Sequence, residues 1–332
     1  MSGKKLLITG ASGFIGSFLV EEGLKRGYEV YAGIRKTSSV QYLTDSRIKF
    51  LELNFSDVGL LSRQLSDAPH FDYVIHSAGL TKAFDLKGYR ISNYQYSKNF
   101  IEVLISLNRV PEKFMYMSSL AAYGPGDPLN VKPVSSSDTP HPVTAYGKSK
   151  LEAEKYLGGL NGFPYISIRP TAVYGPREKD LFTVFSLINK HIELGVGFKK
   201  QYLSFVYVKD AVKAAFLAME SEAMNKGYFV SDGNVYDSQI FGTVIKQVLG
   251  RKTIRIQLPL GLVRLIAVLS ESTKYITRKQ PVLNLDKVKE LESVNWKCDI
   301  QPLRDDLKFE PEYDLDKGIR ETIEWYRQAG WL

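Results

Sequence analysis

A tyrosine and a lysine four residues apart, Tyr146 and Lys150, form a pair whose side chains can act together in proton transfer. Residues at positions i and i+4 of a helix lie on one face, so this spacing places an ammonium group beside a phenol. The positive charge is expected to lower the pKa of the phenol, which could then pass a proton to or from a reacting oxygen near neutral pH. The pair therefore predicts acid–base chemistry.

The spacing alone does not identify the site, because the chain contains it four times. The context of Tyr146 distinguishes it, since a predicted strand ending in Ser118-Ser119 precedes its helix. A serine hydroxyl at the carboxyl end of a parallel strand lies at the edge of the sheet where ligands bind. We interpret the other three pairs as core or surface tyrosines with solvated lysines: Tyr94/Lys98, Tyr275/Lys279 and Tyr313/Lys317.

Three glycines, Gly10, Gly13 and Gly16, separate the first predicted strand from the first predicted helix. Glycine permits a tight turn and lets phosphate groups approach the backbone, and a helix N-terminus presents unpaired amides to a pyrophosphate. The spacing is G-x-x-G-x-x-G, and its place at the start of a βαβ pattern predicts a dinucleotide-binding loop. The expected cofactor contacts are Gly10, Ser12, Gly13, Phe14, Ile15 and Gly16.

The end of the second predicted strand bears on which dinucleotide is bound. An NAD site usually has an acidic residue about 20 residues after the glycines, which binds the ribose 2′-hydroxyl. Here the position holds Arg35, followed by Lys36. Because a guanidinium can bind a 2′-phosphate that a carboxylate would repel, we predict NADP, with NAD as the alternative. Asn54 and Phe55 are predicted to flank the adenine, with a packed turn as the alternative.

Short apolar strands alternate with helices through the first half of the chain. This order predicts an α/β fold, a Rossmann-type doubly wound parallel sheet with a smaller, mostly C-terminal substrate domain. Expected strands are Lys4–Thr9, Glu29–Ile34, Ile48–Leu53, Tyr73–Ser77, Phe114–Ser118 and Tyr165–Arg169, and expected helices are Phe14–Arg26, Asn93–Leu107 and Thr144–Leu157.

The regular alternation weakens after about residue 175. We predict a dinucleotide-binding domain of residues 1–175 plus about 204–234, and a substrate domain of residues 176–203 plus 235–332. Within the first, the returning elements are expected at Phe205–Val208, Asp210–Met219 and Tyr228–Ser231.

Composition limits the class of protein. The 332 residues are 44% hydrophobic and 24% charged, which is typical of a globular protein with a large core. The single cysteine, Cys298, and the lack of a recognisable signal peptide predict a cytoplasmic protein. The net charge of +8 is concentrated locally, and no nucleic-acid-reading motif accompanies it, so nucleic acid is not an expected partner.

The local excess of positive charge lies in residues 251–279, which hold seven basic residues and one acidic residue. Within this segment, Leu258–Leu269 is apolar almost all round, and Pro259 suits the first turn of a helix. Three interpretations stay open: a helix in peripheral contact with the inner face of a membrane, an apolar lid over the pocket, or a core helix with a basic rim.

The sequence as a whole resembles the extended short-chain dehydrogenase/reductase family, also called the NAD-dependent epimerase/dehydratase family. Its C-terminal part is similar to the hydroxysteroid dehydrogenase, dihydroflavonol reductase and bacterial lipid-ketone reductase side of that family. The segments that carry the resemblance are Thr9–Gly16, Val74–Gly79, Ser118–Gly124, Tyr146–Lys150, Arg169–Pro176 and Phe205–Asp210.

The resemblance implies roles for individual residues. Ser119, rather than Ser118, would bind the substrate oxygen, and Tyr146 would be the acid/base. Lys150 would bind the nicotinamide ribose and tune Tyr146. The remaining implied roles belong to Ala78 and Gly79 beside the cofactor, Asn93 in ordering the site, and Pro170 and Val173 in a turn that meets the carboxamide.

Two departures from the family pattern narrow the activity. Leu120 and Ala121 follow Ser119, where the nucleotide-sugar dehydratases have an acidic pair that removes water, so dehydration is not expected. The family's V-x-D-D-type element reads Val208–Asp210 here, which weakens its role in sugar binding.

Together these features predict NADPH-dependent reduction of a ketone on a bulky, largely apolar substrate, plausibly a lipid such as a sphingolipid ketone. The alternative enzyme is a nucleotide-sugar 4-epimerase with tightly bound NAD. A non-enzymatic dinucleotide sensor ranks below both, because it would not need a serine, a tyrosine and a lysine together. The helices expected at Asn93–Leu107 and Thr144–Leu157 could form a homodimer, as they often do in the family.

Overall fold

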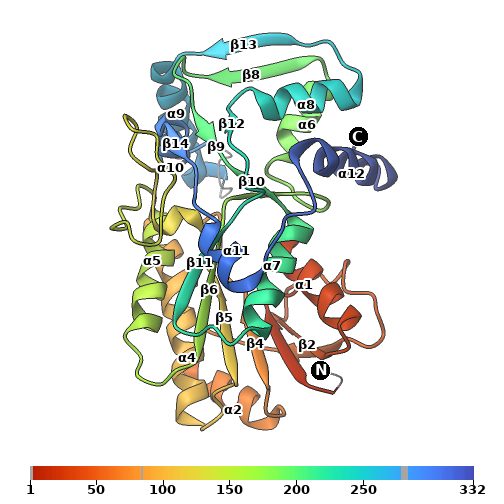
Figure 1. The fold of residues 1–332 in the computed structure, drawn as a ribbon, viewed down its shortest axis with the longest axis vertical. Coiled ribbons are helices and arrows are strands. Elements are labelled where there is room, and N and C mark those ends of the chain that lie inside the picture. Colours follow the sequence, from red (N-terminus) through yellow and green to blue (C-terminus); the bar gives the residue numbers. More distant parts are fainter. Residues whose placement is uncertain (1–2, 84, 278–282) are drawn as a thin grey trace.

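The computed structural model describes the backbone of residues 3–83, 85–277 and 283–332, and side chains except those of 273–277 within that range. Its lower half is one parallel sheet of seven strands in the order β11-β6-β5-β4-β1-β2-β3 (Figure 1). From β1 the strands are added first on one side of the sheet (β2, β3) and then on the other (β4 onwards), as in a doubly wound Rossmann sheet. This order confirms the predicted fold class. The strands are β1 Lys5–Thr9, β2 Glu29–Ile34, β3 Lys49–Glu52, β4 Tyr73–His76, β5 Lys113–Met117, β6 Tyr165–Pro170 and β11 Lys226–Val230.

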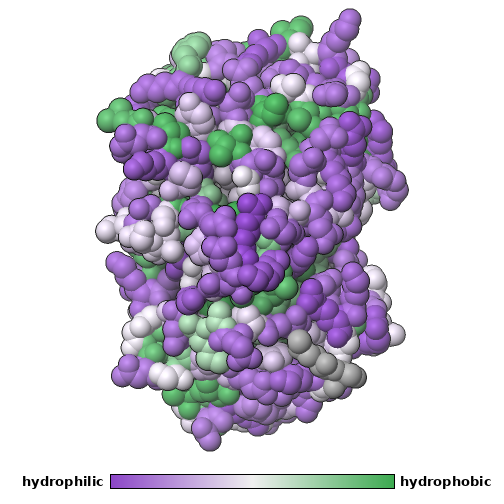
Figure 2. All heavy atoms as spheres, in the orientation of Figure 1, coloured by the Kyte–Doolittle hydropathy of each residue, from purple (hydrophilic) through white to green (hydrophobic). Residues whose placement is uncertain are grey.

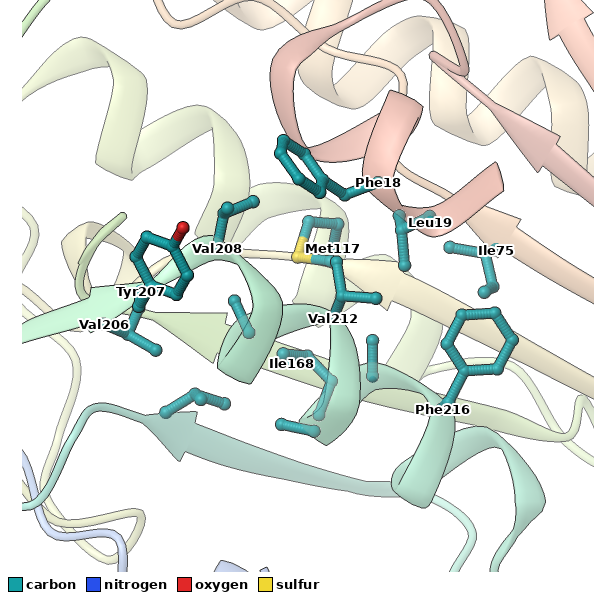
Figure 3. Packing of buried hydrophobic residues seen from close by; sticks show 14 of the residues in the cluster. Phe18, Leu19, Ile75, Met117, Ile168, Val206, Tyr207, Val208, Val212 and Phe216 are labelled. Atoms are coloured by element: carbon teal, nitrogen blue, oxygen red, sulfur yellow. The ribbon is translucent and has the colours of Figure 1, made fainter. Parts of the chain in front are cut away.

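Helices cover both faces of this sheet, because its strands are apolar on both sides. Alternate residues of β1 show the division, with Leu6 and Ile8 in one buried cluster and Leu7 in the other. Helices α1 (Phe14–Lys25) and α7 (Val208–Glu220) cover the first face, and Figure 3 shows Phe18 and Phe216 from them over the sheet. The second face is covered by α2 Val58–Asp67, α4 Tyr96–Ser106 and α5 Ala145–Gly158.

Two segments differ from the sequence prediction. The expected helix Asn93–Leu107 begins with a π-helical turn, Ile91–Gln95, which follows α3 (Leu86–Arg90) and leads into α4. The expected return of Phe205–Val208 to the main sheet is wrong. There β10 (Phe205–Tyr207) pairs with β7 (Ala172–Tyr174) in a separate two-stranded sheet, because β11 already occupies the open edge of β6.

The upper half of the molecule is built from small sheets and short helices (Figure 1). Asp210 ties it to the lower half, since its carboxylate accepts hydrogen bonds from the backbone amides of Glu312 and Tyr313 at 3.0–3.1 Å. Its strands are β8 Ile192–Val196, β9 Tyr202–Leu203, β12 Tyr236–Asp237, β13 Ile254–Leu258 and β14 Asn295–Trp296; its helices are α6 Phe182–Asn189, α8 Ile240–Leu249, α9 Leu260–Thr277, α10 Leu285–Glu292 and α12 Leu315–Gln328. Helix α11 (Gln301–Leu307) packs instead beside β11 of the main sheet.

Apolar helix α9 is longer than the sequence pattern suggested, and it begins directly after Pro259. None of the helices within the described residues has the length and apolar character needed to cross a membrane.

Candidate active site at the carboxyl edge of the sheet

The glycine loop is a tight turn packed against the end of β4. Gly10 has φ +68°, and a Cβ there would lie 2.7 Å from the Ser77 carbonyl oxygen and the Ala78 amide nitrogen. A Cβ on Gly16 would lie 2.0 Å from the Gly10 carbonyl oxygen. Both positions therefore require glycine, the first for its backbone angle and its neighbours, the second for close approach.

The start of α1 fits the pyrophosphate of a dinucleotide. Gly13 is the N-cap and supplies no side chain, so the amides of the first turn are left for a ligand. Ser12 is half-buried and Gly13 exposed, whereas Phe14 and Ile15 pack their side chains on the core. These residues fit the predicted loop, with Phe14 and Ile15 contributing through their backbone.

Arg35 emerges beside this loop. The register of β1 and β2 pairs Thr9 with Gly33, which brings the end of β2 alongside the base of the glycine turn. The side chains of Arg35 and Lys36 are exposed, and no ion pair engages either one in the part of the chain that the structure describes. The Arg35 carbonyl and amide close a turn with Ser38 at 2.9 and 3.1 Å, so the cations project from an ordered turn.

The predicted adenine contacts are engaged in local packing. Asn54 Oδ1 accepts hydrogen bonds from the amide and hydroxyl of Ser56 at 3.1 and 2.6 Å. The Phe55 ring meets the rings of His76 and Phe100, with centroids 5.7 and 5.3 Å away. These contacts are those of the packed turn that the sequence left open as the alternative.

Tyr146 and Ser119 are brought together where α5 begins. Thr144 caps the helix by accepting a hydrogen bond from the Gly147 amide at 3.0 Å. A Cβ on Gly147 would lie 2.1 Å from the Ala121 carbonyl oxygen, so the helix start packs directly on the turn that follows Ser119. As a result the Ser119 side chain lies beside the Tyr146 phenol, where it acts to lower the pKa of that group.

The expectation that Lys150 lowers the pKa of the Tyr146 phenol is corrected by the surroundings of the two side chains. Removal from water raises the pKa of Tyr146 to about 12, and the neighbouring Ser119 hydroxyl only partly opposes this rise. Lys150 does not acidify the phenol, because its Nζ donates instead to the Met117 carbonyl oxygen at 2.7 Å. Burial also lowers the pKa of Lys150 to about 8, against the charge of Glu154. At neutral pH Tyr146 is therefore a protonated phenol, the form that donates a proton.

Asn93 joins the catalytic helix to the cofactor side. It is fully buried in the π-helical turn, an irregularity often found at functional sites. Its Oδ1 accepts from the Leu80 amide at 2.7 Å, and its Nδ2 donates to Ser149 Oγ at 3.0 Å. A Cβ on Gly79 would lie 2.8 Å from Asn93 Oδ1 and 3.4 Å from Lys150 Nζ, so the predicted Ala78-Gly79 segment passes directly beside the lysine.

A buried chain of hydrogen-bonded side chains, which the sequence patterns did not reveal, supports Asn93. Ser97 donates to the Asn93 carbonyl oxygen at 2.8 Å, so it must accept from His76 Nε2 at 2.9 Å. The other ring nitrogen, Nδ1, then accepts from Thr9 Oγ1 at 2.7 Å. Burial and the charge of Lys150 lower the pKa of His76 to about 3, which keeps the ring neutral. The chain links the base of the glycine loop to the catalytic side. The signal for this chain in the sequence was the presence of polar residues, Thr9 and His76, at the ends of two apolar strands that lie next to each other in the sheet.

A buried ion pair lies one helical turn after Lys150. Glu154, one helical turn after Lys150, forms an ion pair with Arg169 at 2.6 Å and accepts a hydrogen bond from Ser118. The Arg169 guanidinium lies 4.5 Å from the centre of the Tyr123 ring. Ser118 thus faces this ion pair, which leaves Ser119 as the serine that meets Tyr146.

Helix α10 borders the site from the upper half. Asp286 accepts a hydrogen bond from the Ala145 amide at 2.7 Å, directly before Tyr146. The Tyr146 ring lies 6.2 Å from that of Tyr89, and the charge of Glu290 reaches both phenols. Helix α10 therefore packs at the start of α5, next to Tyr146.

The remaining tyrosine–lysine pairs and the predicted turn residues lie as follows. The Lys317 ammonium lies 4.3 Å from the centre of the Tyr313 ring, and Lys98 pairs with Glu102 at 3.6 Å, so neither pair resembles the Ser119 site. The Tyr275 side chain and Lys279 lie outside the described residues. Pro170 ends β6 in the core, and Val173 is half-buried in β7 next to it.

A Rossmann sheet with this glycine loop and a serine–tyrosine–lysine group at its carboxyl edge defines a nicotinamide-dinucleotide enzyme. Residues 6–230 match the model of the NAD dependent epimerase/dehydratase family, and the chain belongs to that family.

Relatives with different activities match nearly the full chain. Ceramide reductase of Caulobacter vibrioides is 24% identical over 328 residues, covering 98% of this chain and 95% of that protein. UDP-glucose 4-epimerase of Vibrio cholerae is 26% identical over 336 residues, covering 98% and 96%. The structure of UDP-glucose 4-epimerase from Thermotoga maritima with UDP-glucose has a TM-score of 0.80 at 22% identity, covering 98% of this chain and 99% of that one.

Proposed function

We propose that this protein is an NADP-dependent oxidoreductase that reduces a ketone on a bulky, largely apolar substrate, such as a sphingolipid ketone. The observation that carries the proposal is the Tyr146 phenol, protonated at neutral pH, beside Ser119 and one helical turn from the buried Lys150. This arrangement suits proton donation to an oxygen at the mouth of a dinucleotide site.

When bound, the dinucleotide supplies the hydride. Tyr146 donates its phenolic proton to the ketone oxygen, and the Ser119 hydroxyl donates a hydrogen bond that orients this oxygen. Lys150 is positively charged below pH about 8, and its ammonium, held by the Met117 carbonyl beside the Gly79 segment, would bind the ribose of the dinucleotide. Asn93 holds the backbone at Leu80, which keeps the Gly79 segment close to Lys150.

The preference for NADP rests on Arg35 and Lys36. Both cations are exposed beside the glycine turn without a carboxylate partner among the described residues. A 2′-phosphate carries the charge and acceptor oxygens that a guanidinium binds well.

Two observations favour an apolar ketone over a nucleotide sugar. The charge that α10 brings near Tyr146 is the carboxylate of Glu290. Both lysines of this helix are paired, Lys287 with Glu290 at 2.6 Å and Lys289 with Asp286 at 3.0 Å, so α10 offers no unpaired cation to a diphosphate. The similarity to ceramide reductase adds support for a lipid substrate, whereas the similarity to UDP-glucose 4-epimerase supports the alternative of a 4-epimerase with tightly bound NAD.

The test combines coenzyme titration with a substrate comparison. NADPH and NADH are titrated separately, and then a long-chain ketone lipid and UDP-glucose are each offered to the enzyme. We expect lipid-dependent oxidation of NADPH and no conversion of UDP-glucose to UDP-galactose. Protein that is purified with tightly bound NAD and interconverts the two UDP-sugars would establish the epimerase instead. Binding of NADPH with no turnover of any carbonyl compound would favour the sensor.

A further inference from the structure

Helix α9 has an apolar face that no part of the described chain covers. Val263 and Ala267 are buried against Val288 of α10, which accounts for one stripe of the helix. On the other side, Leu265 and Leu269 are 55% and 57% exposed, and Leu262, Ile266 and Val268 are also exposed. Of the three interpretations of this segment, a buried core helix is therefore wrong. Figure 2 shows hydrophobic side chains at several places on the surface of the upper half of the molecule.

The apolar surface continues beyond α9. Ile254 and Leu194, on the paired strands β13 and β8, are 73% and 48% exposed. The loop after β8 also reaches α9, since Gly197 lies against Leu260, the first residue of that helix. The next residue, Phe198, is 77% exposed. We call the exposed apolar residues of α9, β8, β13 and Phe198 the α9 surface.

The charges around the α9 surface are positive. Arg251 and Lys252 precede β13 and Arg255 lies within it, and all three are exposed without an ion-pair partner among the described residues. Lys199 and Lys200 follow Phe198 and are exposed in the same way.

The neighbouring acids do not offset this charge, because each is engaged within the fold. Glu193 pairs with Lys246, Glu292 pairs with Arg264, and Glu271 accepts from the Leu285 amide.

We propose that the α9 surface docks this protein on a bilayer that contains anionic phospholipid. A helix with an exposed apolar face and basic neighbours lies in the interfacial plane, its leucines among the acyl chains and its cations at the headgroups. Charge complementarity selects a lipid surface over a second copy of this chain, because two copies would bring the same cations together. The docking rests on this surface alone and does not depend on the proposed substrate.

Docking through α9 would place the active site next to the bilayer. Helix α10 packs on α9 and also holds the start of the catalytic helix through Asp286 and Ala145. A single helix, α10, therefore lies between α9 and the start of α5, where Tyr146 lies. If the substrate is a lipid, as proposed above, it would enter from this side.

Sedimentation with vesicles tests the docking without any catalytic readout. Purified protein is mixed with vesicles of phosphatidylglycerol and phosphatidylcholine, or of phosphatidylcholine alone. We expect at least tenfold stronger binding to the anionic vesicles, and loss of that preference at high salt. Leu265→Glu/Leu269→Glu should reduce binding at least tenfold, and Arg251→Glu/Arg255→Glu should abolish the preference for anionic lipid. Val58→Glu is the matched control, because Val58 is 50% exposed on α2 at the opposite end of the molecule.

Three outcomes would overturn the docking proposal. These are failure of the wild-type protein to sediment with anionic vesicles, unchanged binding by the leucine variant, and a wild-type dimer in light scattering that becomes a monomer in that variant. The last would assign the surface to a second copy. Turnover of a water-soluble ketone is expected to be the same in the variants and the wild-type protein. If the wild-type protein and all the variants fail to turn over this ketone, that result counts against the proposed function and leaves the docking result intact.

Discussion

Two regions of the molecule treat polar and apolar groups in opposite ways. At the carboxyl edge of the parallel sheet, polar side chains are buried and partnered, as in the chain from Thr9 through His76 to Ser97. At the α9 end, large apolar side chains such as Leu265 and Ile254 are exposed. The first arrangement holds donor and acceptor atoms at defined hydrogen-bond distances. The second leaves apolar surface that a partner outside the chain can cover.

This difference suggests a division of tasks between the two regions. Proton transfer needs donors and acceptors held at defined distances, which buried hydrogen-bond networks provide. Contact with a fluid or bulky apolar partner needs area rather than exact positions. Substitutions at the sheet edge should therefore have steep and local effects, whereas those on the α9 surface should leave the chemistry intact.

The largest effect is expected for Tyr146→Phe. Removing the phenolic hydroxyl removes the proton donor, so turnover should fall by about 10³-fold or more, while NADPH affinity stays within a few-fold of the wild-type value. Steady-state kinetics and fluorescence titration of NADPH measure the two quantities. The matched control is Tyr94→Phe, in another copy of the same spacing, which should retain near-normal turnover. Full activity of the Tyr146 variant would remove the catalytic assignment.

Gly16→Ala should nearly abolish dinucleotide binding. The added Cβ would lie 2.0 Å from the Gly10 carbonyl oxygen, so the turn must open, and we expect a loss of affinity of about 10²-fold together with a lower melting temperature. Gly261→Ala is the control, because a Cβ there meets nothing within 4 Å. That helical substitution should stabilise the protein by roughly 0.5–1 kcal/mol. Equal affinities in the Gly16 variant and the wild-type protein would contradict the close packing of the loop.

Arg35→Asp should change the choice of coenzyme. A carboxylate beside the glycine turn would repel a 2′-phosphate and accept a hydrogen bond from a 2′-hydroxyl, so the ratio of kcat/KM for NADPH to that for NADH should fall by roughly 10- to 100-fold. Arg63→Asp, on the exposed side of α2, controls for the change in net charge. An unchanged ratio would remove the basis for NADP.

The smallest effect is expected in the pH dependence of stability. The pKa of His76 falls from 6.5 to about 3 on folding, so between these values the unfolded chain binds more protons than the native one. Stability should therefore be lost as the pH falls below 6.5, with a contribution of about 1.4 kcal/mol per pH unit from this residue. Denaturant unfolding at pH 7 and pH 5 should show a shallower pH dependence for His76→Gln than for the wild-type protein. His70→Gln, at an exposed histidine, should leave the slope unchanged; equal slopes for all three proteins would show that His76 is not held neutral.

The sequence alone predicted the fold class, which the structure confirms, and it singled out the glycine loop and the Ser119, Tyr146 and Lys150 group, because these depend on local patterns. Alternating apolar strands and helices predict the parallel sheet, and a helical spacing of four places Tyr146 and Lys150 on one face. The preceding strand and the family resemblance singled out this copy of the pair from four.

Only the tertiary structure decided how the groups around the trio interact. The partner of Lys150 is the Met117 carbonyl on β5, and Asn93 reaches the site through a π-helical turn that the 3.6-residue period does not reveal. The high pKa of Tyr146 follows from desolvation, which depends on every element packed around it. Likewise, the sequence showed that α9 is apolar all round, but the choice of exposed face depends on where α10 packs, and periodicity does not record which neighbour a helix meets.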